Sequence, residues 1–241
     1  MLNNQKSQVT LFIILGIIIL AGAGFFLYAQ KIKNPVEPEV NLVQQQVPIE
    51  FDPIKKYAND CVSSVAVNGL KLIGKQGGYI SFTNKSLNTL AFTITPNPTE
   101  SDAIAFTKNS ELEIPYWWYL KSSNTCNGNC QFSSKRPDLR QSDTSIEKQL
   151  ERYINAELKS CLNDFKQFKE QGYKISENGG VKSDVTIASG DVIVSVDYPI
   201  SAEKGNSKTD VDQFLVRVPV NLEKIYNLAS KITNLDRKSV V

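Results

Sequence analysis

Four cysteines, at positions 61, 126, 130 and 161, are the residues of this chain whose type and spacing suggest chemistry most directly. Cys126 and Cys130 flank a short polar turn, Asn127–Asn129, which a disulfide could close. An even number of cysteines favours two disulfides, which leaves Cys61 and Cys161 for the second bridge. A four-cysteine zinc site is the alternative, although its ligands usually come in closely spaced pairs and only Cys126 and Cys130 meet that spacing.

The chain contains no histidine. This absence excludes His-dependent catalytic triads, most catalytic zinc sites and imidazole proton shuttles, and a catalytic cysteine would lack its activating base. Carboxylates pair at Glu111/Glu113 and at Asp210/Asp212, as a hydrolase or a calcium site requires, but solvated strand edges produce the same pattern. We therefore expect a protein that is not an enzyme and holds no metal or cofactor.

Charge is nearly balanced along the 241 residues, with 27 Lys and Arg against 25 Asp and Glu. Binding a nucleic-acid backbone requires a clustered excess of cations, so nucleic acid is not an expected partner. The length is sufficient for one substantial hydrophobic core.

Residues 6–31, KSQVTLFIILGIIILAGAGFFLYAQK, contain no charged side chain between the two terminal lysines. About 20 helical residues cross the ~30 Å hydrocarbon core of a bilayer, so residues 9–29 predict a transmembrane helix after a short cytoplasmic lead, residues 1–8. A cleaved secretory signal ending near Ala21–Ala23 and a buried helix of a soluble protein are the alternatives. The retained helix is favoured because the chain stays apolar beyond that triplet as far as Tyr28, an aromatic residue suited to the membrane interface.

The N-terminal residues also resemble a known family. Lys6-Ser7-Gln8, followed directly by the apolar helix, resembles the class III signal of archaeal type IV pilin-like proteins. The resemblance implies cleavage between Ser7 and Gln8 by a prepilin-type peptidase, and assembly of copies into a filament through the helix. The body resembles uncharacterised archaeal membrane-anchored proteins with a paired-cysteine helical body, and this implies no activity.

The rest of the chain is expected outside the cytoplasm, because disulfides persist in oxidising compartments. Residues 30–50 contain several prolines and glutamines without a helical period, which predicts an extended stalk. Residues 51–241 follow as an extracytoplasmic domain, within which Asn84-Lys85-Ser86 is a candidate glycosylation acceptor.

Apolar residues at helical spacing predict amphipathic helices from Asp52 to about Gly74 and over residues 145–171, and a final helix over residues 221–235. Cys61 and Cys161 lie on the apolar faces of the first two helices. Packing of those faces would bring the two thiols together, which favours their pairing.

Alternating apolar residues predict strands within residues 79–120 and a four-stranded antiparallel meander after residue 172, with a hairpin turn at Asn178–Gly180. Residues 121–144 are expected to form an exposed polar lobe. The first strand region ends in four adjacent aromatic residues, which on a strand would point alternately to two faces. One face would be core, and the other could bind a sugar or a peptide. These candidate binding residues are Tyr116, Trp117, Trp118 and Tyr119.

The sequence therefore predicts an α+β fold in which amphipathic helices pack on antiparallel sheets behind an N-terminal transmembrane helix. Two helix-then-strands blocks, residues 51–120 and 145–220, suggest an internal duplication. The expected function is a structural or binding role at the cell surface, in a single-pass protein anchored in the lipid bilayer through residues 9–29. The alternative is a type IV pilin-like subunit, and copies of the chain or another surface protein are the candidate partners.

Overall fold

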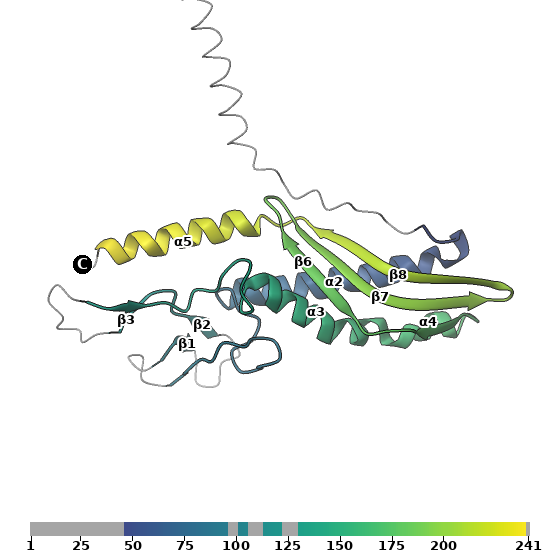
Figure 1. The fold of residues 1–241 in the computed structure, drawn as a ribbon, viewed down its shortest axis with the longest axis horizontal. Coiled ribbons are helices and arrows are strands. Elements are labelled where there is room, and N and C mark those ends of the chain that lie inside the picture. The colour runs from purple at the N-terminus through teal and green to yellow at the C-terminus, as the bar shows by residue number, and fades with distance from the viewer. Residues whose placement is uncertain (1–45, 96–100, 106–112, 122–129, 240–241) are drawn as a thin grey trace, which may run out of the picture. The chain divides into compact units, whose positions relative to one another are not determined.

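A four-stranded antiparallel sheet with two helices against one face forms the main body of the chain (Figure 1). The structure is a computed structural model that describes residues 46–95, 101–105, 113–121 and 130–239. The predicted α+β class is confirmed. The elements in chain order are η1 (Ile49–Phe51), α2 (Asp52–Lys75), β1 (Ala103–Ala105), β2 (Glu113–Pro115), β3 (Tyr119–Leu120), β4 (Phe132–Ser133), α3 (Ile146–Leu162), η2 (Asn163–Phe165), α4 (Lys166–Lys169), β5 (Lys174–Glu177), β6 (Lys182–Ile187), β7 (Val192–Lys204), β8 (Ser207–Val218) and α5 (Leu222–Ser239).

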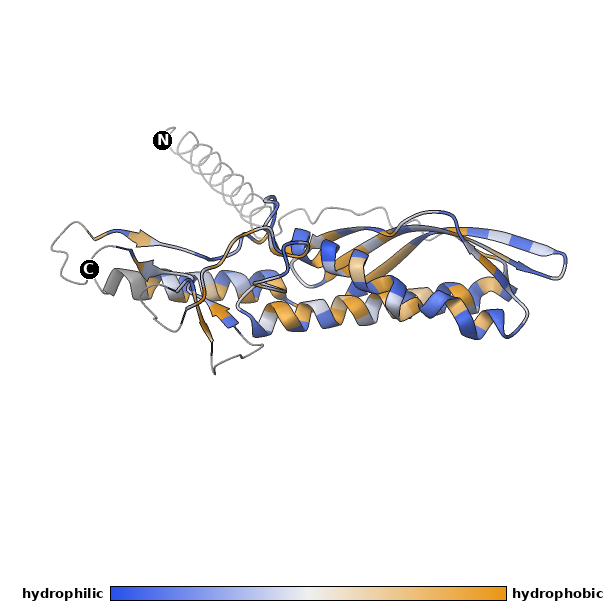
Figure 2. Cartoon of the chain, turned by 90° about the horizontal axis from the view of Figure 1, so that it is seen from below, coloured by the Kyte–Doolittle hydropathy of each residue, from blue (hydrophilic) through white to orange (hydrophobic). Residues whose placement is uncertain are grey.

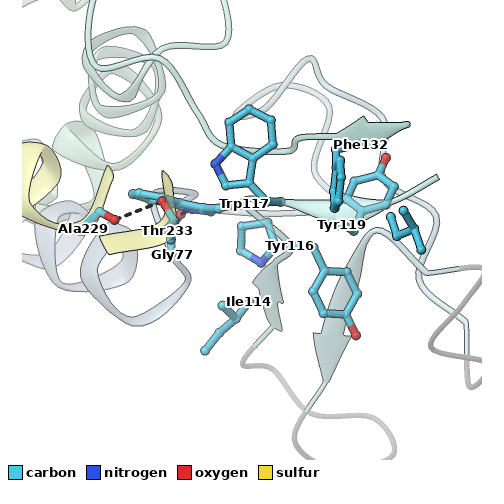
Figure 3. A pocket seen from close by; sticks show the side chains of 11 residues that line it. Gly77, Ile114, Tyr116, Trp117, Tyr119, Phe132, Ala229 and Thr233 are labelled. Atoms are coloured by element: carbon cyan, nitrogen blue, oxygen red, sulfur yellow. Dashed lines mark hydrogen bonds between the residues drawn. The ribbon is translucent and has the colours of Figure 1, made fainter. Parts of the chain in front are cut away.

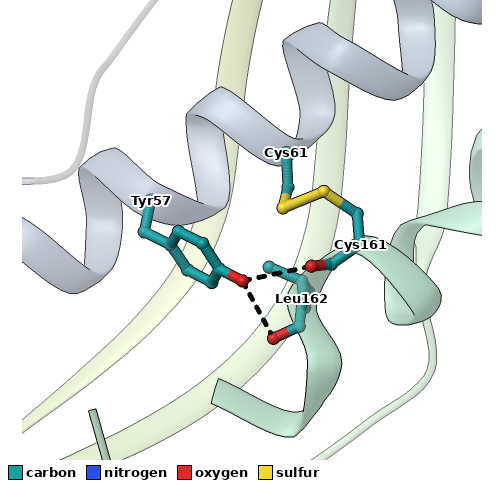
Figure 4. The surroundings of a disulfide bond; sticks show 4 residues. All are labelled: Tyr57, Cys61, Cys161 and Leu162. Atoms are coloured by element: carbon teal, nitrogen blue, oxygen red, sulfur yellow. Dashed lines mark hydrogen bonds between the residues drawn. A yellow bond between two sulfur atoms is a disulfide. The ribbon is translucent and has the colours of Figure 1, made fainter. Parts of the chain in front are cut away.

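Helices α2 and α3 lie side by side and run in opposite directions. Cys61 of α2 is bonded to Cys161 of α3, with 5.7 Å between their Cα atoms (Figure 4). Further along the contact, a Cβ added to Gly69 of α2 would lie 2.5 Å from Cδ1 of Leu150, so the helices approach closely where α2 has no side chain. The predicted pairing of Cys61 with Cys161 is confirmed, and it removes two of the ligands that a four-cysteine zinc site would need.

The C-terminal end of α3 differs from the prediction of one helix over residues 145–171. Three consecutive residues, Asn163–Phe165, have positive φ values of 46°, 51° and 52°, and they break the helix. Asn and Asp tolerate this left-handed conformation better than most residues. The Tyr57 hydroxyl of α2 donates to the carbonyl oxygens of Cys161 at 3.1 Å and Leu162 at 3.3 Å, which lie in the last turn of the broken helix (Figure 4).

Strand β7 is the centre of the sheet and pairs with all three other strands. Strand β8 runs along one side of β7, while β6 pairs with residues 192–197 and β5 with residues 200–203 on the other side. Because β5 and β6 run in the same direction along β7, the hairpin predicted at Asn178–Gly180 is wrong. Strands β5 and β6 instead lie end to end along the same side of β7, and this segment separates them. It lies opposite a register shift in the β7–β8 pairing. A Cβ on Gly179 would lie 2.8 Å from Cγ of Pro199, so a larger residue would crowd the interruption.

The hairpins of this sheet lie at residues 188–191 and 204–207. Between β6 and β7 the Ala188 N–H donates to the Asp191 carbonyl at 2.9 Å. Between β7 and β8, Lys204 pairs with Ser207 around Gly205, whose φ of 60° suits glycine.

Side chains of α3 bond the outer edge of β6. The backbone N–H groups of residues 183, 185 and 187 donate to the side-chain oxygens of Asn155 (2.8 Å), Glu151 (3.3 Å) and Glu147 (2.9 Å) respectively. Four helical residues rise about 6 Å and two strand residues about 6.6 Å, so the two spacings match. Burial raises the pKa of Glu147, although the Ile187 N–H and Arg140 oppose that shift. This edge of the sheet is therefore occupied within the chain.

One hydrophobic core lies between the helix pair and the sheet (Figure 2). Alternate residues of β7 face it, and the apolar stripes of α2 and α3 cover them. Its largest fully buried side chains are Tyr198, Phe51, Phe165, Phe214, Ile54, Ile146, Leu150, Ile154, Leu158, Leu162 and Ile187.

A smaller lobe follows α2 and contains two ladders, β1–β2 and β3–β4. The prediction of strands within residues 79–120 is wrong for residues 79–82 and 90–95, because both of these segments are irregular. Their aromatic side chains form a separate cluster instead, in which the ring centroids of Tyr79, Phe82 and Phe92 lie 4.7–5.5 Å apart. Much of the backbone there bonds to side chains rather than to a neighbouring strand.

Residues 130–144 are not the exposed polar lobe that the sequence predicts. Leu139 is buried, and Arg140 joins three elements by contacting Glu147 of α3 at 3.6 Å, Glu223 of α5 at 3.1 Å and the Ile187 carbonyl of β6. Sequence polarity is misleading here because a single arginine can satisfy several partly buried acceptors.

Several predictions fall outside the described residues. These are the transmembrane helix over residues 9–29, the processing site at Ser7 and Gln8, most of the stalk, and Cys126, so the bridge from Cys126 to Cys130 stays a prediction. Among the described helices, none is long and apolar enough to cross a bilayer. The suggested duplication also stays a prediction.

Removing the bridge between the helices is expected to destabilise the domain strongly. The cysteines are 100 residues apart, and closing a loop of that size contributes about 4.7 kcal/mol in the chain-entropy model. The variant carrying Cys61→Ala and Cys161→Ala should lose several kcal/mol of unfolding free energy in urea titrations. Unchanged stability, or free thiols at both positions in the wild-type chain, would contradict the prediction.

The close contact between α2 and α3 predicts that a glycine-to-valine substitution in α2 lowers the free energy of unfolding at position 69 but not at position 74. Gly69→Val should lower the free energy of unfolding by about 1–3 kcal/mol, because the new side chain overlaps Leu150 and Tyr153. Gly74→Val is the matched control in the same helix, where nothing lies within 4 Å of an added Cβ, and it should be close to neutral. Equal effects in urea titration would show that helix propensity, rather than packing, decides.

Candidate functional site

The four adjacent aromatic residues lie at a bend rather than on one strand. Tyr116, Trp117 and Trp118 connect β2 to β3, and Tyr119 begins β3. All four are half-buried, so none is a core residue and none stands free in solvent. The predicted alternation between a core face and an open face is therefore wrong, because all four residues at the bend line one space.

That space is a pocket of about 550 Å³. Ligand pockets typically measure ~300–1,000 Å³, so it could hold a small molecule or a few side chains. Its described lining comes from the end of α2, strands β2 to β4 and one face of α5 (Figure 3), and none of these described residues has a charged side chain. The lining residues are Gly77, Ile114, Pro115, Tyr116, Trp117, Trp118, Tyr119, Leu120, Phe132, Ala229 and Thr233.

Trp117 is fixed from two sides. Its indole N–H donates to the Gly77 carbonyl oxygen at 2.9 Å, directly after α2. Its ring lies 5.7 Å from the ring of Tyr226 on α5, at an interplanar angle of 51°. The Tyr226 hydroxyl in turn donates to the Pro137 carbonyl at 2.8 Å. Trp117 therefore links the end of α2 to α5.

Gly77 is required at this position for two reasons. Its φ of 58° lies in the left-handed region, and a Cβ would lie 2.8 Å from Cδ of Pro115. The close approach of this backbone to β2 leaves its carbonyl available to Trp117.

Polar groups beneath the aromatic bend are largely engaged within the protein. The Tyr119 hydroxyl donates to Oδ1 of Asp102 at 3.4 Å, and Asp102 also forms an ion pair with Lys135 at 3.3 Å. The Tyr79 hydroxyl donates to the Lys135 carbonyl at 3.0 Å. Burial, reinforced by the charge of Asp138, raises the pKa of Tyr79 beyond its usual range, so this hydroxyl stays a donor.

Some of the polar side chains in the pocket lining are already engaged within the protein. The Thr233 hydroxyl donates to the Ala229 carbonyl of its own helix at 3.0 Å (Figure 3). Burial raises the pKa of Glu113, which precedes the lining residue Ile114. The arrangement suits an apolar ligand that stacks on aromatic rings.

The other predicted site residues lie elsewhere. Cys61 and Cys161 form the structural bridge in the helix pair. Asn84 is exposed in a turn, where its side-chain oxygen accepts from the Ser86 N–H at 3.0 Å, and its glycosylation stays a prediction. Within the described part of the chain, no group of three or more His, Cys, Asp or Glu residues could hold a metal ion.

Sequence reasoning found the four aromatic residues but missed the opposite wall. Phe132 and Ile114 are ordinary strand residues, and Ala229 and Thr233 of α5 are small residues more than a hundred positions away. The only sequence signal for the α5 residues of this wall was the helical period of their segment, which predicts a helix but not the element that the helix contacts.

Compared with known proteins, the chain matches no family model, no curated protein and no solved structure.

Proposed function

We propose that the chain is a single-pass, membrane-anchored extracytoplasmic protein that binds an apolar polypeptide segment in its aromatic pocket at the cell surface. The pocket carries the proposal, because Tyr116, Trp117, Trp118 and Tyr119 line one space, and the residues that the structure describes around it are all uncharged. Aromatic-lined grooves of this type recognise extended or proline-containing peptides through stacking and apolar contact.

A peptide is favoured over a sugar as the ligand, because several polar side chains of the pocket already form hydrogen bonds within the protein. Sugar recognition needs side-chain donors and acceptors directed at the ligand hydroxyls, since each hydroxyl buried without a partner costs free energy. In this pocket the Trp117 indole, the Tyr119 hydroxyl and the Thr233 hydroxyl already have partners within the protein. Apolar side chains of a peptide need no hydrogen-bond partners from the same surface.

The compartment is supported by the sequence and by the bridge. Residues 9–29 have the length and composition of a transmembrane helix. The bridge between Cys61 and Cys161 is typical of proteins in an oxidising environment. Together they favour an anchored domain on the outer side of the membrane.

A pilin-like subunit is the second candidate function, favoured by Lys6-Ser7-Gln8 immediately before the apolar stretch. In that case the helix would pack against its copies in a filament, and the domain would still face outward.

Peptide binding can be measured through the protein's own fluorescence, because the chain contains only two tryptophans and both line the pocket. Short random peptides displayed on phage should select apolar and proline-containing sequences, and the synthesised peptides should shift the tryptophan emission. Thr233→Lys places a cation in the pocket and should weaken binding at least about tenfold.

Asn227→Lys is the matched control, because it adds the same charge to an exposed position of the same helix. Its affinity should equal that of the wild-type chain. Emission shifts with soluble oligosaccharides but with no selected peptide would refute the proposed ligand class.

Mass spectrometry of the native N-terminus separates the anchored protein from the pilin-like subunit. A retained lead, with the chain in the membrane fraction and Cys61 and Cys161 bridged, is expected for the static anchor. A chain that begins at Gln8 would support the pilin-like alternative, and a chain recovered in reduced form from the cytoplasm would rule out both.

A further inference from the structure

We propose that α5 joins two copies of this chain through a parallel helix pair. The helix carries four large apolar side chains that project into solvent, with exposed fractions of 58% for Ile225, 61% for Leu228, 59% for Ile232 and 66% for Leu235. No other part of the described chain exposes large apolar residues in such a row, because the remaining two, Ile49 and Ile104, lie far apart in sequence.

The spacing of these residues is that of a coiled-coil seam. Successive members are three, four and three positions apart, which places Ile225 and Ile232 at the a positions of a heptad and Leu228 and Leu235 at the d positions. Isoleucine at a with leucine at d is the combination that favours two parallel strands. A second copy of the chain supplies the same residues in the same order, so the seam is self-complementary.

The seam is distinct from the side of α5 that packs on its own domain. Tyr226 and Thr233 face the small lobe, where Tyr226 contacts Trp117 and Pro137 and Thr233 lines the pocket. Glu223 is held by Arg140 at 3.1 Å. These contacts fix the helix on the domain, so pairing would cost little additional ordering.

The lysines of α5 discriminate between the two directions of pairing. Lys224 and Lys231 occupy g positions beside the seam, and both are exposed. In an antiparallel pair g positions face each other, which would set lysine against lysine, whereas in a parallel pair Lys224 faces the position of Ala229 on the other copy. Like charges in contact are unfavourable, so the parallel arrangement is preferred.

A bilayer surface is the main competing occupant, since exposed apolar helices also lie in membrane interfaces. Here the exposed residues form one narrow row, and the apolar residues next to it are already engaged with the lobe. A narrow row fits between the side chains of another helix better than it fits a flat surface.

The seam is short, and this sets the conditions under which pairing should occur. Stable interfaces bury about 800 Å² on each partner, which is more than four side chains supply. Two copies held in one membrane have a raised effective concentration, which would compensate for a weak contact. This last step rests on the membrane anchor proposed above, whereas the seam itself does not.

Isotope-labelled cross-linking tests the proposal on the full chain. Light and heavy copies are mixed, reconstituted together in lipid vesicles and treated with an amine-reactive cross-linker. Peptides that join a light to a heavy copy should pair Lys224 with Lys224 and Lys231 with Lys231. Leu228→Glu and, separately, Ile232→Glu should reduce these mixed peptides at least about tenfold, because each places a charge in the seam.

Asn227→Glu is the matched control, since it adds the same charge at the adjacent exposed position outside the seam. It should leave the mixed peptides unchanged. Absence of mixed peptides in the wild-type chain, or their persistence in both seam variants, would overturn the proposal, and a dominant Lys224–Lys231 product would overturn the parallel arrangement. If the seam variants lose vesicle contact in a fluorescence-quenching assay while the mixed peptides persist, the bilayer covers the row and the proposal fails. Peptide binding in the pocket is scored independently, because position 228 lies outside its lining.

Discussion

The contact between α2 and α3 is the constraint on which the rest of the structure depends. The bridge from Cys61 to Cys161 fastens one end of the helix pair. At the other end, the fully buried side chain of Gln149 on α3 accepts from the Ile80 N–H at 3.2 Å and donates to the Gly78 carbonyl at 3.3 Å. Because both ends are fixed, the segment that leaves α2 has a defined position. The aromatic bend is built on that segment through the bond from Trp117 to Gly77.

The helix pair also protects one edge of the sheet. A strand with a free edge offers unpaired backbone groups to other chains, and proteins usually protect such edges. Here Glu147, Glu151 and Asn155 of α3 accept the edge N–H groups of β6 at matching spacing. The same helix therefore covers one face of the sheet and satisfies one of its edges. The cost of burying Glu147 is seen in the raised pKa of its carboxyl group, and the nearby Arg140 offsets part of this shift.

The sequence allowed prediction of the elements whose pattern is periodic and local. The three long helices and the antiparallel sheet have apolar residues at helical or alternating spacing, and the pairing of Cys61 with Cys161 followed from their places on two apolar faces. Residues 79–95 could not be predicted in this way, because their aromatic residues serve a small cluster rather than a strand face. Asn178–Gly180 has the composition of a tight turn, yet the register of β7 decides that the chain continues straight. The sequence located one wall of the pocket but not the other, since small residues such as Ala229 carry no recognisable signal.

Helix α5 shows how one periodic pattern can serve two surfaces. Read from the sequence, its apolar residues form a single broad stripe of the kind that normally faces a core. The structure divides that stripe, since residues such as Tyr226 and Ala229 meet the lobe while Ile225 and Leu228 do not. The contacts of the lobe reach Tyr226, Ala229 and Thr233, and they leave Ile225, Leu228, Ile232 and Leu235 exposed. A helix placed in this way can complete a pocket with one side and meet a second helix with the other, and neither contact requires the helix to move.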